Sequence, residues 1–152
     1  MLTLLTCAFV LCLIYHSYTD FEEMLLYDWN NLILAVLGLI FAYLNHNVSD
    51  ALFGFAFALM VLLIIYFASK GGLGEGDVKL APCLALWLGF EGTIVALLLA
   101  FTLGAIIGLT YMLLQNKQIK TAIPFGPFLC LGSLISFFFK TTIINFYWNF
   151  FI

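Results

Sequence analysis

Long apolar runs separated by short polar stretches dominate the chain. Most of these runs reach or approach the roughly 17–25 apolar residues that a helix needs to cross the hydrocarbon core of a membrane. The pattern therefore predicts an all-α integral membrane protein that folds as a single domain, residues 1–152. We expect six transmembrane helices, at residues 2–18, 29–44, 51–69, 78–90, 93–114 and 123–139.

The fourth and fifth expected helices come from one apolar stretch, residues 78–114. As a single helix this stretch would extend about 55 Å at 1.5 Å per residue, whereas the hydrocarbon core is about 30 Å thick. The stretch must therefore fold back on itself. Gly89-Phe90-Glu91-Gly92 is the natural turn, because it carries two glycines and the only charge in the stretch besides Lys79.

Composition excludes several other classes of protein. The chain is 65% hydrophobic and 9% charged, whereas globular domains are about 45–50% apolar and about 25% charged. Disordered chains are poor in aromatic residues, and this chain is 18% aromatic. It has five lysines, no arginine and eight acidic residues, so no basic patch exists to bind nucleic acid. Membrane lipid is the expected surrounding.

The positions of the lysines predict which face of the membrane each loop occupies. Lys70 and Lys79 flank the third loop of the six-helix pattern, and Lys117 and Lys120 lie in the fifth. These loops share a face with the first loop, residues 19–28, and the loops on the opposite face contain no lysine. The positive-inside rule makes the lysine-bearing face cytoplasmic and places both termini outside.

Most acidic residues lie on the same expected cytoplasmic face. We interpret Glu22 and Glu23 as residues of a solvated loop. Asp20 directly continues the first apolar helix, and Asp77 follows four glycines in six residues before another apolar helix. Ionisable groups at the ends of membrane helices are candidates for function. A glycine-rich backbone is permissive and allows an extended peptide to lie against it.

Two carboxyl groups on neighbouring helices are the minimum for aspartic proteolysis. Like charges held close together cannot both ionise, so one group can accept a proton from water while the other polarises a peptide carbonyl. The chain lacks the common serine-hydrolase, zinc-protease and P-loop motifs, and we expect neither a metal nor an organic cofactor. His16 lies four residues before Asp20, either as a hydrogen-bond partner of Asp20 or as an ordinary interfacial histidine.

Three sequence motifs resemble those of the type IV prepilin peptidases, the bacterial leader peptidases of the A24 class. Gly74-Glu75-Gly76-Asp77 resembles the GxGD signature of that family. Asp20 and Asp28 repeat its D-x7-D pattern, and Ile-Pro-Phe-Gly-Pro-Phe at residues 123–128 resembles the motif before its last helix.

The resemblance implies a six-helix peptidase in the bacterial inner membrane with its active site at the cytoplasmic face. Asp20 and Asp77 correspond to the catalytic pair of the family. The substrate would be a prepilin or pseudopilin, cleaved after a glycine. The resemblance also gives an active-site loop or substrate-positioning role to a further set of residues: Asp28, Gly74, Glu75, Gly76 and Lys79.

The chain departs from the family pattern in three respects. It lacks the cytoplasmic insert with paired cysteines that longer members use to methylate the new N-terminus, so we expect a short form without methyltransferase activity. Tyr27 replaces the usual proline before the second aspartate, and Glu75 replaces a small or apolar residue.

Two alternative functions stay open. One is a small transporter or channel component with Asp20 and Asp77 as an ion or proton relay, and the other is a non-catalytic subunit of a pilus or secretion machine.

Overall fold

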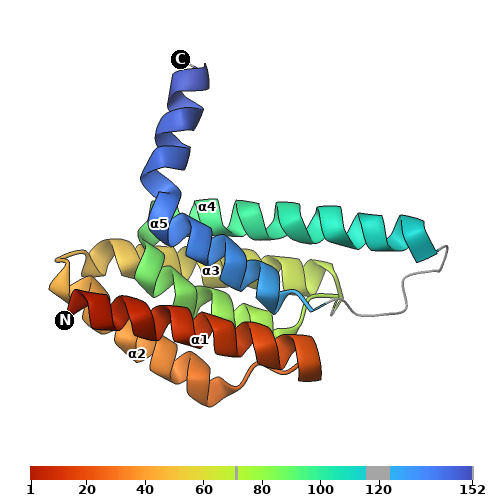
Figure 1. Ribbon diagram of the computed structural model, residues 1–152, viewed down its shortest axis with the longest axis horizontal. Coiled ribbons are helices and arrows are strands. Elements are labelled where there is room, and N and C mark those ends of the chain that lie inside the picture. The colour runs from red at the N-terminus through yellow and green to blue at the C-terminus, as the bar shows by residue number, and fades with distance from the viewer. Residues whose placement is uncertain (71, 116–123, 152) are drawn as a thin grey trace.

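The computed structural model describes residues 1–70, 72–115 and 124–151. These residues form helices and no strand, which confirms the all-α fold class. The helices are α1 (Leu2–Glu23), α2 (Asp28–Leu44), α3 (Val48–Ala68), α4 (Glu75–Gln115) and α5 (Gly126–Phe151) (Figure 1). By length and composition α1, α3, α4 and α5 are able to cross a membrane, and α2 is a shorter apolar helix. The chain is therefore a multi-pass membrane protein.

The prediction of six separate spans is not confirmed, because α4 covers both of the spans expected at 78–90 and 93–114. The expected turn is nevertheless present within α4. Gly89 is non-helical, with φ 72° and ψ −178°, and Figure 1 shows the chain reversing its direction there. Glycine adopts positive φ without a steric penalty, so one residue is sufficient to break the helix.

Two helices are longer than the sequence pattern predicted. The first helix was expected to end at residue 18, but it continues to Glu23 and ends at Met24, whose φ is 52°. Thr19 and Asp20 are buried, so this polar end of α1 packs against protein. The last helix continues past 139 to Phe151, and its C-terminal part turns away from the other helices (Figure 1). The expected start of that helix at 123, and Lys117 and Lys120, lie outside the described residues.

The first arm of α4 lies at the centre of the helix bundle. The Trp87 ring stacks on Phe9 of α1 at 4.7 Å and on Phe41 of α2 at 5.1 Å between ring centroids. Its indole Nε1 donates a 2.9 Å hydrogen bond to the backbone oxygen of Leu34. Trp87 therefore ties three helices together.

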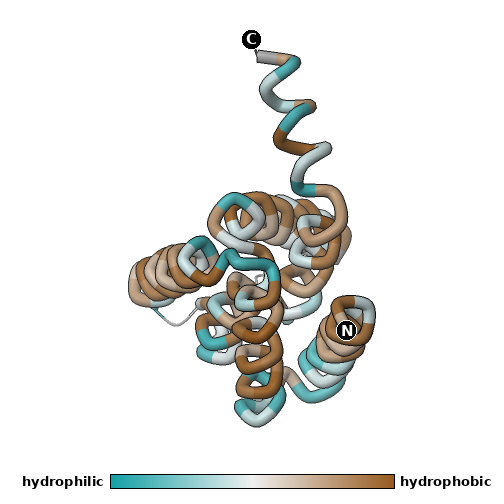
Figure 2. The backbone as a smooth tube through the Cα atoms, turned by 90° about the vertical axis from the view of Figure 1, so that its left-hand side faces the viewer, coloured by the Kyte–Doolittle hydropathy of each residue, from teal (hydrophilic) through white to brown (hydrophobic). Residues whose placement is uncertain are grey.

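Apolar residues also cover the outer surfaces of the helices (Figure 2), as expected for surfaces that face lipid.

Charged side chains from two other helices bind the backbone on either side of the Gly89 turn. The Oδ1 atom of Asp50 in α3 accepts a 3.2 Å hydrogen bond from the Phe90 N–H. The Nζ atom of Lys140 in α5 donates a 3.0 Å hydrogen bond to the Leu88 oxygen. A break in a helix frees backbone groups that must be paired inside a membrane protein. Asp50 and Lys140 supply those partners.

Candidate active site

The predicted site residues come together at one cavity. It has a volume of about 450 Å³ and lies between the end of α1, the α1–α2 loop and the first turns of α4. We name it the aspartate cavity. Residues 24–27 line the cavity. So do all of the site residues predicted from the sequence: Asp20, Asp28, Gly74, Glu75, Gly76, Asp77 and Lys79.

Asp20 is held in place by the beginning of α5. It lies in the last turn of α1 and is only 6% exposed. Its Oδ2 atom accepts a 2.8 Å hydrogen bond from the backbone N–H of Gly126, the first residue of α5. The first N–H groups of a helix have no partner within the helix and favour a negative charge nearby. Asp20 therefore caps α5 and is fixed by it.

Gly126 is the residue of this site that the sequence analysis did not select. A Cβ atom built on it would lie 2.6 Å from Oδ2 and 3.0 Å from Cγ of Asp20, which leaves no room for a side chain. Its only signal in the sequence is the Pro-Phe-Gly-Pro segment, which entered the analysis through the family resemblance. Asp20 and Gly126 are 106 positions apart in the sequence, so no local pattern predicts their contact.

Asp77 lies in the first turn of α4 and is 5% exposed. Its carboxylate interacts with the Gly74 N–H and lies close enough to Asp20 for electrostatic repulsion. Its Oδ1 atom is buried and has no hydrogen-bond partner among the described residues. Buried carboxylate oxygens are nearly always paired, so an unpaired one is the state expected of an atom that binds water or substrate.

The glycines before Asp77 are required by space rather than by positive φ, since Gly89 is the one described glycine with a positive φ. A Cβ atom on Gly74 would lie 2.9 Å from Oδ2 of Asp77. A Cβ atom on Gly76 would lie 2.9 Å from the Cβ of Leu26 in the α1–α2 loop. Both glycines therefore allow close approach at the wall of the cavity.

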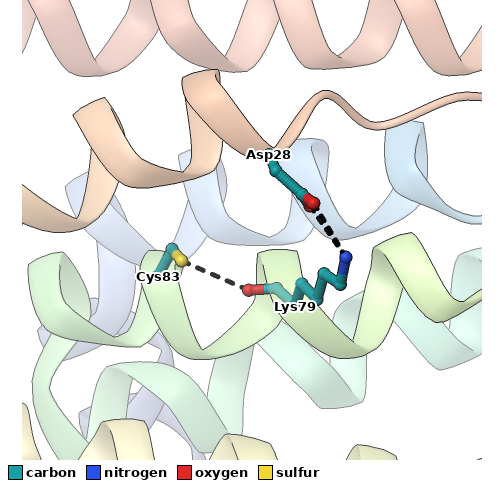
Figure 3. A network of polar contacts seen from close by, with 3 residues as sticks. All are labelled: Asp28, Lys79 and Cys83. Carbon is teal, nitrogen blue, oxygen red and sulfur yellow. Dashed lines mark hydrogen bonds and ion pairs between the residues drawn. The ribbon is translucent and has the colours of Figure 1, made fainter.

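An ion pair joins α2 to α4 beside the cavity. Nζ of Lys79 lies 2.9 Å from both carboxylate oxygens of Asp28 (Figure 3). The two side chains are 56% and 70% exposed, so water screens the attraction between them. The carbonyl oxygen of Lys79 also accepts a 3.2 Å hydrogen bond from the Cys83 thiol. Glu75 accepts a 3.0 Å hydrogen bond from the Tyr66 hydroxyl, which directs this third carboxylate toward α3.

His16 is fully buried, and neither of its ring nitrogens has a hydrogen-bond partner among the described residues. The hydrogen bond to Asp20 that the sequence offered as one interpretation is therefore not formed. The described residues also contain no group of three or more His, Cys, Asp or Glu side chains that could hold a metal ion. Asp20 and Asp77 are two buried carboxyl groups that line one cavity, and a closely placed carboxyl pair is what acid–base hydrolysis by two carboxyl groups requires.

Comparison with known proteins gives one family. The profile of the type IV leader peptidase family matches residues 7–109, a range that includes Asp20 and Asp77. A prepilin leader peptidase/N-methyltransferase of Aeromonas hydrophila is 36% identical over 138 residues, which are 86% of this chain and 48% of that protein. Proteins of the same description match from Pseudomonas aeruginosa (34% identity, 88% of this chain, 49% of that protein) and Legionella pneumophila (43%, 59% and 31%).

The chain thus spans about half the length of the first of these relatives. No solved structure matches it at a comparable level of significance.

Proposed function

Because the chain belongs to the type IV leader peptidase family, we propose that it is an aspartic endopeptidase that removes the leader of a type IV prepilin or pseudopilin. The family resemblance drawn from its motifs is thereby confirmed. Family membership favours the peptidase over a transporter component or a non-catalytic assembly subunit. The observation that carries the proposal is the burial of Asp20 and Asp77 together at the aspartate cavity.

In the proposed reaction the two aspartates share one proton. The ionised carboxyl accepts a proton from a water molecule in the cavity while the protonated carboxyl donates a hydrogen bond to the scissile carbonyl. The oxygen of that water attacks the carbonyl carbon, and the proton passes to the leaving amine as the C–N bond breaks. The hydrogen bond from Gly126 supports a fixed position for Asp20, and the unpaired Oδ1 of Asp77 is available to water or substrate.

The surrounding residues have supporting roles in this proposal. Gly74 and Gly76 let Asp77 and Leu26 pack closely against the start of α4 at the edge of the cavity, and cleavage follows a glycine of the substrate. Lys79 and Asp28 hold the α1–α2 loop beside α4 and position the substrate, and Glu75 lies at the same edge. We assign this chain the peptidase step. The reaction needs neither a metal nor an organic cofactor.

We further propose that the chain crosses the bacterial inner membrane six times, with the two arms of α4 as separate spans and the aspartate cavity at the cytoplasmic face. The reversal at Gly89 supports two spans in α4, and the lysine distribution supports the orientation. Single cysteines at positions 24 and 47, in a background without the four native cysteines, test the topology. A membrane-impermeant thiol reagent should label position 47 from outside and position 24 only after the membrane is opened; labelling of both from one side contradicts the proposal.

The activity itself is tested by incubating the purified protein, in detergent or in liposomes, with a candidate prepilin. Mass spectrometry of the product should show one cut after a glycine at the start of the hydrophobic segment. Asp20→Asn and Asp77→Asn should not release the leader, whereas Glu22→Gln, which changes an exposed carboxylate two residues from Asp20, should release it normally. Full cleavage by either aspartate variant would contradict the proposed function.

A further inference from the structure

A second hollow lies near the last turns of α1, which carry Asp20. It is an open groove of about 350 Å³ between α1 and α5. We name it the α1–α5 groove. Its lining is apolar apart from one hydroxyl and one thiol, and it includes Leu13, Ile14 and Ser17 of α1 and Pro127, Cys130 and Leu131 of α5.

The groove leads to the aspartate pair. Ser17 lies three residues before Asp20 on α1, and Pro127 directly follows Gly126, whose N–H binds Asp20. The Cys130 thiol lies within electrostatic reach of both Asp20 and Asp77. One end of the apolar groove therefore lies close to Asp20, which itself lines the aspartate cavity with its charged edge.

The outer side of the groove is open. Ile14 is 60% exposed and Leu131 is 46% exposed, although both are large apolar residues. On a helix bundle in a membrane such residues face lipid or another helix. The lining of α1 from Val10 to Ser17 extends about 10 Å along the helix axis, which is the length of two helical turns.

We propose that the α1–α5 groove binds the hydrophobic helix of the substrate and brings the end of that helix to Asp20 and Asp77. This proposal rests on the proposed function. An apolar helix docks into an apolar groove by side-chain packing. The closeness of the groove to the catalytic pair selects this occupant, because the substrate is the partner whose hydrophobic helix must end near the two carboxyl groups. Water then reaches the peptide bond from the aspartate cavity.

Kinetics with two substrates test the proposal. One substrate is a candidate prepilin with its hydrophobic segment, and the other is a short peptide that keeps the leader and cleavage site but lacks that segment. Ile14→Trp and Leu131→Trp fill the groove and should lower kcat/KM for the prepilin at least tenfold while leaving that for the peptide within twofold. Leu11→Trp changes a residue of α1 that is 65% exposed and outside the groove, and it should alter neither value. Equal losses for both substrates, or no loss for the prepilin, overturn the proposal.

Photo-crosslinking gives a measurement that does not depend on turnover. A diazirine amino acid close in size to leucine, which does not fill the groove, is placed at position 14 or 131 of the Asp77→Asn protein in liposomes. It should crosslink to the hydrophobic segment of the prepilin, and the same probe at position 11 should not. Crosslinks to lipid or to a second copy of the protein, without crosslinks to prepilin, overturn the proposal. Failure of the wild-type protein to cleave prepilin would instead contradict the proposed function, so the two failures are distinguishable.

Discussion

The backbone N–H of Gly126 donates a 2.8 Å hydrogen bond to Oδ2 of Asp20, and a methyl group on Gly126 would overlap that oxygen. Gly126→Ala should therefore displace Asp20 from its partner. We expect kcat/KM for prepilin cleavage to fall at least tenfold, a loss of about 1.4 kcal/mol or more in transition-state stabilisation. Normal activity of Gly126→Ala would mean that Asp20 tolerates displacement.

The two aspartates should behave as one unit in kinetics. Asp20→Asn and Asp77→Asn each remove one member of a pair that shares a proton, so the double variant should be no slower than the slower single variant. Single-turnover assays on the purified variants measure this. Additive losses in the double variant would show that the two carboxyl groups act independently.

Gly76→Ala tests the wall of the aspartate cavity. The added methyl group would lie 2.9 Å from Cβ and 3.0 Å from Cδ1 of Leu26, so the α1–α2 loop must move. Overpacking of this kind costs about 1–3 kcal/mol, and we expect both the detergent melting temperature and the cleavage rate to fall. Shortening the neighbour in Gly76→Ala/Leu26→Ala should recover part of both losses. If the double variant has the same melting temperature and cleavage rate as Gly76→Ala alone, the strain does not lie between these two residues.

The ion pair between Lys79 and Asp28 should contribute little to stability. Both side chains are more than half exposed, and exposed pairs contribute about 0–1 kcal/mol. Lys79→Gln and Asp28→Asn should each lower the free energy of unfolding by less than about 1 kcal/mol. If these residues position the substrate, KM for prepilin should rise while kcat stays within about twofold. Loss of kcat with unchanged KM would assign them to the chemical step.

The turn in α4 should be intolerant of any side chain at Gly89. Its φ of 72° with ψ −178° is a conformation essentially restricted to glycine, and a Cβ atom there would collide with Asp50. Gly89→Ala should lower the free energy of unfolding by about 1–3 kcal/mol. Asp50→Ala, which removes the partner of the Phe90 N–H, should cost about 1–3 kcal/mol, and Asp50→Asn less because it keeps an acceptor. Reversible unfolding in detergent measures all three; a fully stable Gly89→Ala would contradict the role of the turn.

Hydropathy and length were sufficient to predict the helical fold and the position of the reversal. The apolar stretch from 78 to 114 is longer than a membrane is thick, so a turn was required, and the glycine pair around Glu91 marked it. The same reasoning misplaced the ends of α1 and α5. Polar residues suggested that α1 stops at 18, but Thr19 and Asp20 are buried against protein, a tertiary effect that hydropathy does not contain.

The site was predictable to the extent that it lies in local motifs. Asp20, Asp28, residues 74–77 and Lys79 could be selected from spacing and from the family resemblance, and they do line one cavity. Gly126 and Leu26 could not, because their importance depends on contacts between distant segments. The role of Lys140 could not be predicted either, because its Nζ donates to the Leu88 oxygen of another helix.

The position of Gly89 has a consequence for the membrane around the protein. The arm of α4 from Glu75 to Leu88 rises only about 21 Å at 1.5 Å per residue, whereas an average hydrocarbon core is about 30 Å thick. A short transmembrane arm is accommodated by thinning of the adjacent bilayer. If the arm spans the membrane, the lipid beside it is compressed, and the Asp77 end of the arm lies nearer to bulk water than it would in an undisturbed bilayer. The hydrophobic mismatch of this one arm would then bring water for hydrolysis closer to the carboxyl pair.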